Sequence, residues 1–280
     1  MPLLLAGVTA ALWGAADFLG GLSAASWRAM RAGAVAQAVG VAVLLPVLPF
    51  LETDRLTAAD IGWGAGAGVG GALGITLLYR ALATGPMNVA APTTAVVGAA
   101  VPVAAGLALG ERPGGLALLG VVLAIAAVGM IGSSPTGLSE EVQGWRVVPM
   151  AALAGVGLGL TGVAFAQTSE SAGIWPAFAA KLSAALLLAV AILASRGGTD
   201  ANARRGLGLS LSAGVVDVVA TALFLVALQR GSLVLVSVIA SLYPATTVVL
   251  ARFALRETIG RVQGMGLALA AVAVALIAVS

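Results

Sequence analysis

Three charged residues fall inside long apolar stretches of the sequence, where a charge is costly and therefore informative. Asp217 lies near the middle of the run 207–229, and Lys181 and Asp17 lie inside two other runs. An ionisable group at mid-membrane costs about 2.5–3.5 kcal/mol on insertion scales and generally marks a substrate, ion or proton pathway. A carboxylate there can load and release a proton, and a lysine can pair with it or hold a carboxylated substrate. We therefore predict a coupling or substrate-binding role for these three residues; the alternative is a fixed Asp–Lys ion pair that only joins two helices.

Uncharged polar and aromatic side chains on probable spans form a second set of candidates. Such groups can line a polar cavity, although serine and threonine in membrane helices more often bond backbone, and tryptophan more often marks the membrane interface. The substrate-binding candidates of this kind are Trp13, Gln167, Asn88 and Tyr243. Other residues with the same two interpretations are Thr93, Thr94, Thr161, Ser237, Ser241 and Trp175.

The sequence lacks the residue types that most catalytic and metal sites use. It has no cysteine and no histidine, which removes disulfides, thiolate nucleophiles, the usual general base and the commonest zinc ligand. The one adjacent pair of acids, Glu140 and Glu141, falls in a segment that is typical of a linker. We therefore expect no enzyme activity, no cofactor and no metal. Since the formal net charge is only +3 and the basic residues are spread along the chain, we also expect no nucleic-acid partner.

Membrane-spanning helices must position these candidates. The 280 residues are 60% hydrophobic and 9% charged, with a mean hydropathy of +1.10. A soluble domain carries roughly 25% charged residues to cover its surface. So few charges cannot coat a water-soluble particle, and the composition predicts an all-α integral membrane protein surrounded by a lipid bilayer.

Charges, prolines and glycine clusters divide the chain into ten apolar runs, each close to the roughly 20 residues that a membrane-spanning helix requires. The predicted spans are residues 2–22, 30–50, 60–79, 86–109, 114–132, 146–167, 174–194, 207–229, 231–254 and 260–279. The first run begins at Pro2 without the basic segment of a signal peptide, so we expect it to be retained as a span.

The two halves of the chain are related in sequence. A shift of 146 residues aligns 77–131 with 223–277 without a gap, and 17 of the 55 columns are identical, against about six expected by chance in a chain so rich in Ala, Leu, Gly and Val. The matched pairs include Gly85 with Gly231, Glu111 with Glu257, Gly114 with Gly260 and Gly120 with Gly266. This predicts a first repeat over 1–133, a linker over 134–145 rich in Gly, Ser and Pro at its start, and a second repeat over 146–280.

Five spans in each half make the second repeat enter the membrane from the opposite side. The predicted fold is therefore ten transmembrane helices arranged as two inverted five-helix repeats. Inverted repeats are characteristic of secondary transporters, in which a substrate site lies near the midplane between the halves.

The sequence resembles the drug/metabolite transporter superfamily, in particular its ten-span family built from two EamA-type repeats. The motif carrying this resemblance is a helix that ends in a Gly-Glu-Arg-like turn, followed nine residues later by a glycine. It is present as Leu109-Gly110-Glu111-Arg112 with Gly120, and as Leu255-Arg256-Glu257-Thr258 with Gly266. The family's proline 13 residues before the glutamate is present as Pro244 but replaced by Gly98 in the first repeat, and Leu12-Trp13-Gly14 is similar to the family's opening motif.

The motif glutamates and glycines are predicted to be structural. Glu111 and Glu257 fall at helix ends, where a carboxylate can accept from the first amides of the following helix. Glycines at 62, 66, 70 and 74 recur every four residues, the spacing that lets two membrane helices approach closely.

The membrane orientation has two conflicting indications. Arginines near the span ends concentrate on the side opposite the termini, which by the positive-inside rule favours both termini outside. The family resemblance implies both termini in the cytoplasm. Both orientations stay open, with a slight preference for the charge count, and the expected location is the cell membrane.

The leading hypothesis is a secondary active transporter of a small organic metabolite, such as an amino acid, a nucleobase or a drug-like compound, that works by alternating access. Export is the expected direction, proton exchange or the solute gradient is the expected driving force, and a monomer or weak homodimer is expected. The alternatives are a flippase for a lipid or lipid-linked headgroup, which would need a sideways-open cavity with a basic lining, and a membrane-embedded enzyme.

Overall fold

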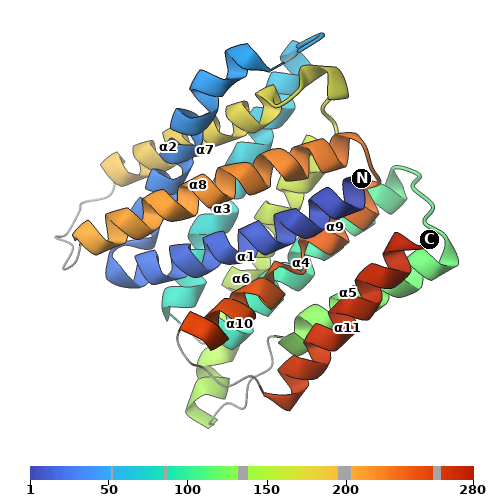
Figure 1. Ribbon diagram of the computed structural model, residues 1–280. Coiled ribbons are helices and arrows are strands. Elements are labelled where there is room, and N and C mark those ends of the chain that lie inside the picture. Colours follow the sequence, from blue (N-terminus) through green and yellow to red (C-terminus); the bar gives the residue numbers. More distant parts are fainter. Residues whose placement is uncertain (52, 85–86, 132–137, 195–202, 255–259) are drawn as a thin grey trace.

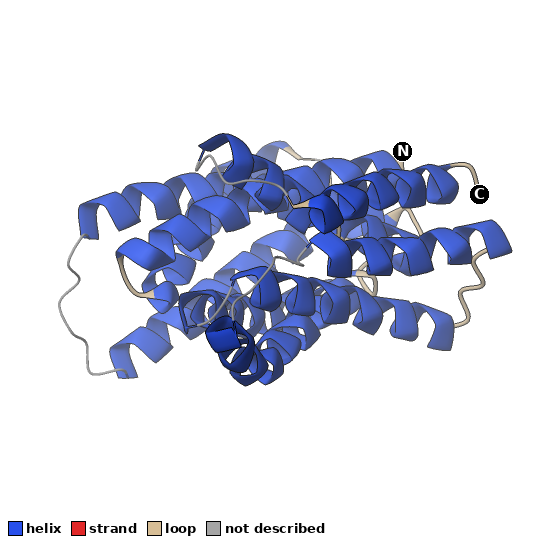
Figure 2. Ribbon diagram, turned by 90° about the horizontal axis from the view of Figure 1, so that it is seen from below, coloured by secondary structure: helices blue, strands red, loops and turns tan. Residues whose placement is uncertain are grey.

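The described part of the chain is entirely helical. The computed structural model describes all 280 residues except 52, 85–86, 132–137, 195–202 and 255–259. Within that part there are eleven α-helices and two short 3₁₀ turns, and no strand (Figures 1 and 2). Both chain ends lie on the same side of the molecule in the two views, as an even number of membrane crossings requires.

The helices confirm the ten predicted spans. The first half contains α1 (Pro2–Ser26), α2 (Ala29–Val47), α3 (Ala58–Thr84), α4 (Met87–Ala108) and α5 (Gly115–Ile131). The second half contains α6 (Leu138–Phe165), α7 (Trp175–Ala194), α8 (Ala203–Gln229), α9 (Leu233–Ala240), α10 (Tyr243–Ala254) and α11 (Arg261–Ala278). Eight stretches are long and apolar enough to cross a membrane, with α9 and α10 together forming one of them, and two shorter apolar helices, Pro92–Ala108 and Gly115–Ile131, complete the ten.

The ninth span, predicted as one helix over 231–254, is in fact two helices, α9 and α10. Pro244 has no N–H to donate to the Ala240 carbonyl, and its ring crowds that carbonyl. The Val238 carbonyl, which a continuous helix would use, instead accepts from Ser241 Oγ at 2.7 Å. The sequence therefore both interrupts this span and supplies a hydroxyl that satisfies the interrupted backbone.

The sixth span begins earlier than predicted. Helix α6 starts at Leu138, eight residues before the expected start at 146, so most of the predicted linker 134–145 is helical. The stretch dense in Gly, Ser and Pro ends at residue 137, directly before the helix begins. Residues 134–137 lie outside the described part.

The two halves are interleaved. Helix α1 packs on α8, α3 packs on α6, α2 packs on α7, and α5 pairs with α11 at one edge of the molecule (Figure 1). Large apolar side chains such as Phe50 and Leu193, each 86% exposed, cover the outer surface, as a lipid-facing surface requires. The most deeply buried helix is α9, which has seven buried residues out of eight.

Glycines set the close approach of α3 to its neighbours on two faces, and only part of the predicted glycine face takes part. A Cβ at Gly68 would overlap the Ala180 carbonyl of α7, and a Cβ at Gly70 would lie 2.8 Å from the Gly157 carbonyl of α6. Gly62 and Gly66, expected on the same contact face as Gly70, face open space instead, since a Cβ at either position would meet nothing within 4 Å. The four-residue spacing therefore predicted the contact with α6 at Gly70 and at Gly74, where a Cβ would lie 2.8 Å from the Leu158 side chain, but it did not predict the second contact face, toward α7.

Candidate functional site

A cavity of about 140 Å³ lies between the two halves. Its lining residues come from α1, α2, α3 and α4 of the first half and from α6 through α10 of the second. Most of the lining is apolar, with a small number of polar and ionisable side chains on facing helices. This is the usual composition of a site that binds a small organic molecule.

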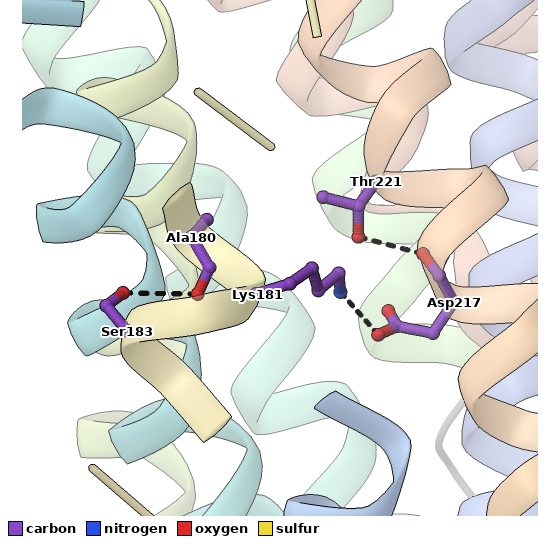
Figure 3. A network of polar contacts seen from close by, with 5 residues as sticks. All are labelled: Ala180, Lys181, Ser183, Asp217 and Thr221. Atoms are coloured by element: carbon purple, nitrogen blue, oxygen red, sulfur yellow. Dashed lines mark hydrogen bonds and ion pairs between the residues drawn. The ribbon is translucent and has the colours of Figure 1, made fainter. Parts of the chain in front are cut away.

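An ion pair links two of the helices that line the cavity. Lys181 Nζ on α7 lies 2.5 Å from Asp217 Oδ2 on α8, and the two side chains are 6% and 21% exposed. Figure 3 shows the lysine extending from α7 toward the carboxylate, with Thr221 Oγ1 donating to the Asp217 carbonyl one turn along α8. The stem of Lys181 passes over α2 at Gly40, where a Cβ would lie 2.8 Å from the lysine Cδ. Only glycine at this position leaves room for the lysine in its present path.

A second carboxylate, Asp17 on α1, lines the same cavity and has no hydrogen-bond donor or ion-pair partner within the described part of the chain. Two glycines bring α1 close to its neighbours around this residue. A Cβ at Gly14 would overlap the Tyr243 carbonyl of α10, and a Cβ at Gly20 would overlap the Tyr79 hydroxyl of α3. These close approaches bring α10 and α3, each with a tyrosine that lines the cavity, against the turns of α1 on either side of Asp17.

Aromatic rings surround the polar groups. Trp13 and Phe224 are tilted against each other with ring centroids 4.7 Å apart. Tyr79, Tyr243 and Phe165 also line the cavity. The Tyr243 hydroxyl and Ser237 Oγ are buried and have no hydrogen-bond partner among the described residues. Buried polar atoms are nearly always satisfied, so two unpaired hydroxyl groups on residues that line one cavity require an explanation.

The structure brings five of the seven predicted binding or coupling candidates together. Asp217, Lys181, Asp17, Trp13 and Tyr243 all line the cavity. Gln167 does not; it is exposed in the turn after α6. Asn88 lies on α4, but its side chain lies outside the described part. The functional roles of all seven remain predictions.

Several residues that line the cavity were not among the candidates. Gln37 on α2 is buried and is the only amide side chain among the described residues of the lining. The sequence could have identified Gln37, because a glutamine inside the apolar run 30–50 is a polar group on a probable span, like the threonines that were considered. Tyr79 was harder to find because it falls at the end of the predicted span 60–79, where tyrosine normally marks the membrane interface.

Glu111 caps a helix, but not the one that follows it. Its carboxylate accepts from the backbone N–H groups of Leu233 (2.7 Å) and Val234 (3.0 Å) and from Ser232 Oγ (2.6 Å), all at the start of α9. Gly110, directly before Glu111, has a φ of 96°, a backbone conformation that favours glycine. Glu111 therefore accepts from the first amides of a helix, but that helix is α9 of the second half and not the following helix, α5, as predicted. The equivalent Glu257 lies outside the described residues.

The motif glycines have reciprocal roles. A Cβ at Gly120 on α5 would lie 2.7 Å from Ile277 of α11, and a Cβ at Gly266 on α11 would lie 2.8 Å from the Ile131 nitrogen of α5. The same motif position in each half therefore allows the same close pairing of α5 with α11.

One end of the bundle is joined across the halves by polar contacts. Ser169 donates through its N–H to Asp60 Oδ1 at 2.8 Å, and Arg55 donates through its N–H to the Ser171 carbonyl at 3.2 Å. Gln229 Nε2 donates to the carbonyl of Ser169 at 2.9 Å. These bonds connect the start of α3 and the loop before it with the loop after α6 and the end of α8.

Comparison with known proteins gives a family and a fold. The sequence profile of the EamA-like transporter family matches residues 1–133 and 145–279. No match was found among curated proteins. A solved crystal structure is similar to this chain with a TM-score of 0.74 and 19% sequence identity, over 99% of this chain and 98% of the other. At that identity the likeness concerns the fold alone.

Proposed function

The chain belongs to the EamA-like transporter family, and on that premise we propose that it is a secondary active transporter of a small organic metabolite that works by alternating access. Family membership gives transport across a membrane. The metabolite class, export as the direction, protons as the coupling ion and the cell membrane as the location are parts of the proposal.

The observation that carries the proposal is the Lys181–Asp217 ion pair in the cavity between the halves. Ionised groups are retained inside membranes mainly along ion and substrate pathways. Protonation of Asp217 would neutralise its carboxylate and release the Lys181 ammonium, so the arrival of a proton changes which charges face a substrate. A pair that switches in this way can couple proton movement to solute movement.

The interrupted ninth span supports alternating access. Broken helices at the midplane are a recurring feature of secondary transporters, because each half-helix can follow a different part of the protein. Here α9 packs about equally against α4 and α1, whereas α10 packs mainly against α1. The break at Ser241 and Leu242, beside the cavity, is the point at which this span can bend during a rocking motion.

The cavity lining favours a solute transporter over a lipid flippase. A flippase needs uncompensated basic groups for a headgroup phosphate, and Lys181, the one basic residue among the described residues of the lining, is already paired with Asp217.

A thermal-shift screen of amino acids, nucleobases and cationic drugs on the wild-type protein first identifies a solute that binds. Transport of that solute under an imposed pH gradient is then measured in vesicles containing the Asp217→Asn variant. We expect pH-driven transport to be abolished while the purified variant remains folded, because an amide cannot exchange a proton with the cavity. Asp54→Asn, which makes the same change at an exposed loop position, is the matched control and should transport normally. Retained pH-driven uptake by Asp217→Asn would remove Asp217 from the coupling mechanism.

A charge exchange separates coupling from a fixed structural pair. The double variant Lys181→Asp with Asp217→Lys keeps an ion pair between α7 and α8 but moves the carboxylate to the other helix. If the pair only joins the helices, both stability and transport should recover relative to Asp217→Asn. If it couples transport, stability should recover and pH-driven transport should not.

A further inference from the structure

We propose that the cavity selects a small organic cation, an amine carrying a single ring, with Asp17 as its counter-ion. This inference rests on the proposed transport function and specifies its substrate class. It follows from the charges, the aromatic lining and the size of the cavity.

The charges favour a cation. Among the described residues, three formally charged side chains line the cavity, the two carboxylates of Asp17 and Asp217 and the ammonium of Lys181. Because Lys181 is held by Asp217 at 2.5 Å, these two charges offset each other. Asp17 is then the group that a ligand meets without a partner. An ammonium would supply that missing partner, whereas a carboxylate or phosphate would meet a like charge.

The aromatic rings and free hydroxyls suit the same ligand. Trp13, Phe224 and Tyr79 are among the residues that line the cavity, and a cation within about 6 Å of a ring centroid is attracted by the ring's quadrupole. An ammonium with N–H donors also requires acceptors. The Tyr243 hydroxyl and Ser237 Oγ belong to residues of the lining and have no partner in the described part, so we assign them as these acceptors. Each of these unpaired groups is therefore one that an amine would satisfy.

The volume limits the size of the amine. A buried apolar cavity of about 150 Å³ holds one benzene molecule, and this cavity measures about 140 Å³. It accommodates one ring with a short chain, and it is too small for a large drug or a nucleotide in the conformation described. Benzylamine fits these limits and is the probe for the test.

The first experiment needs no variant. Binding of benzylamine, benzyl alcohol and benzoate to the purified wild-type protein is measured by isothermal titration calorimetry at pH 8, where the first ligand is a cation, the second neutral and the third an anion. All three have the same ring and nearly the same size. We expect affinity to fall in that order, with benzylamine at least tenfold tighter than benzyl alcohol. Tighter binding of benzoate, or no measurable binding of benzylamine, would overturn the proposal.

The second experiment assigns the preference to Asp17. In Asp17→Asn, benzylamine affinity should fall at least tenfold while benzyl alcohol affinity is unchanged, because the ring site is intact and only the charge is lost. Asp54→Asn is the matched control, since its carboxylate is exposed in a loop outside the cavity. If Asp17→Asn does not fold, the charge series on the wild-type protein still decides. A folded Asp17→Asn variant that binds benzylamine as the wild type does would contradict the assignment.

A counterflow assay in vesicles separates this inference from the proposed function. Exchange of radiolabelled benzylamine across the vesicle membrane requires a transporter, whereas binding in detergent requires only the site. Binding with the expected charge preference but without counterflow would support the cation site and contradict transport. Counterflow of a neutral or anionic solute that benzylamine does not inhibit would support transport and contradict the cation site.

Discussion

Helix α4 and the pair α9–α10 occupy equivalent places in the two repeats but have different structures. Adding the repeat shift of 146 to the bounds of α4, Met87–Ala108, gives Leu233–Ala254, which are the first residue of α9 and the last of α10. The first-half copy is a single helix, and the second-half copy is broken at Ser241 and Leu242. Duplication therefore preserved the length and position of this span but not its continuity.

Proline content alone does not account for the difference. Helix α4 continues through Pro92 and Pro102, whereas the second-half span breaks just before Pro244. The residue equivalent to Pro244 is Gly98 and the residue equivalent to Ser241 is Ala95, which carries no hydroxyl. A break that combines a proline with a nearby hydroxyl leaves fewer unsatisfied carbonyls than a proline alone.

The same contrast holds at the ion pair. Subtracting 146 from Asp217 gives Gly71, and both residues line the cavity. The two repeats thus contribute equivalent positions to the site, but α8 supplies a carboxylate where α3 supplies a glycine. The chemistry of the cavity lies in the positions at which the repeats differ, whereas the packing motifs Gly120 and Gly266 lie where they agree.

Exchanging the proline between the repeats should give the largest effect on stability. Gly98→Pro removes a backbone bond inside α4 and crowds the preceding turn without an added hydroxyl, so we expect a loss of about 3 kcal/mol or more in the free energy of unfolding. Pro244→Gly should cost about 1 kcal/mol or less, since that helix is already interrupted. Circular dichroism during titration with sodium dodecyl sulfate measures both. Equal losses would show that the break does not depend on the residue at this position.

The capping glutamate should have an intermediate effect. Glu111→Gln weakens three charge-assisted bonds to the start of α9, and we expect a loss of about 1–2 kcal/mol in the same assay. Because the repeat places Glu257 at the equivalent position, Glu257→Gln is predicted to cost as much.

The control for the capping test is Glu170→Gln. Glu170 forms an ion pair with Arg230 at 2.6 Å, but the two side chains are 57% and 53% exposed. Exposed pairs contribute about 0–1 kcal/mol, so this variant should be close to wild type. If Glu111→Gln is no more destabilising than this control, the bonds between the halves at α9 are not important for stability.

Two neighbouring serines should give the smallest effect. Ser241→Ala leaves the Val238 carbonyl without its hydrogen bond and should cost about 1 kcal/mol. Ser237→Ala removes a hydroxyl that has no partner in the described part, so the stability should be unchanged or slightly raised. The melting temperatures of the two purified variants provide the comparison. A larger loss for Ser237→Ala would contradict the role of Ser241 at the break.

The sequence was sufficient to predict the spans and the duplication, because apolar runs of about 20 residues and a gapless repeat are local signals. It also identified Asp17, Lys181 and Asp217 as charges that needed an explanation. It did not identify the partner of Glu111, since the capped helix begins 121 residues later in the chain (232 minus 111). Nor did it separate the contact glycines of α3 from those that face open space, because Gly66 and Gly70 differ only in what packs against them. What remained unpredictable depended on contacts between segments far apart in the chain.

The cap that Glu111 places on α9 also affects how the protein is made. A ribosome adds about 5–20 residues per second, so roughly 6–24 s pass between the synthesis of Glu111 and that of Ser232. When that interval begins, the first four helices are already synthesised, but the amides that Glu111 binds do not yet exist. The Glu111 carboxylate, in the turn between α4 and α5, must therefore stay hydrated at the membrane surface until α9 has been synthesised. The joining of the two halves is consequently a late event of biosynthesis, and a chain truncated after residue 133 would leave Glu111 without the partners seen here.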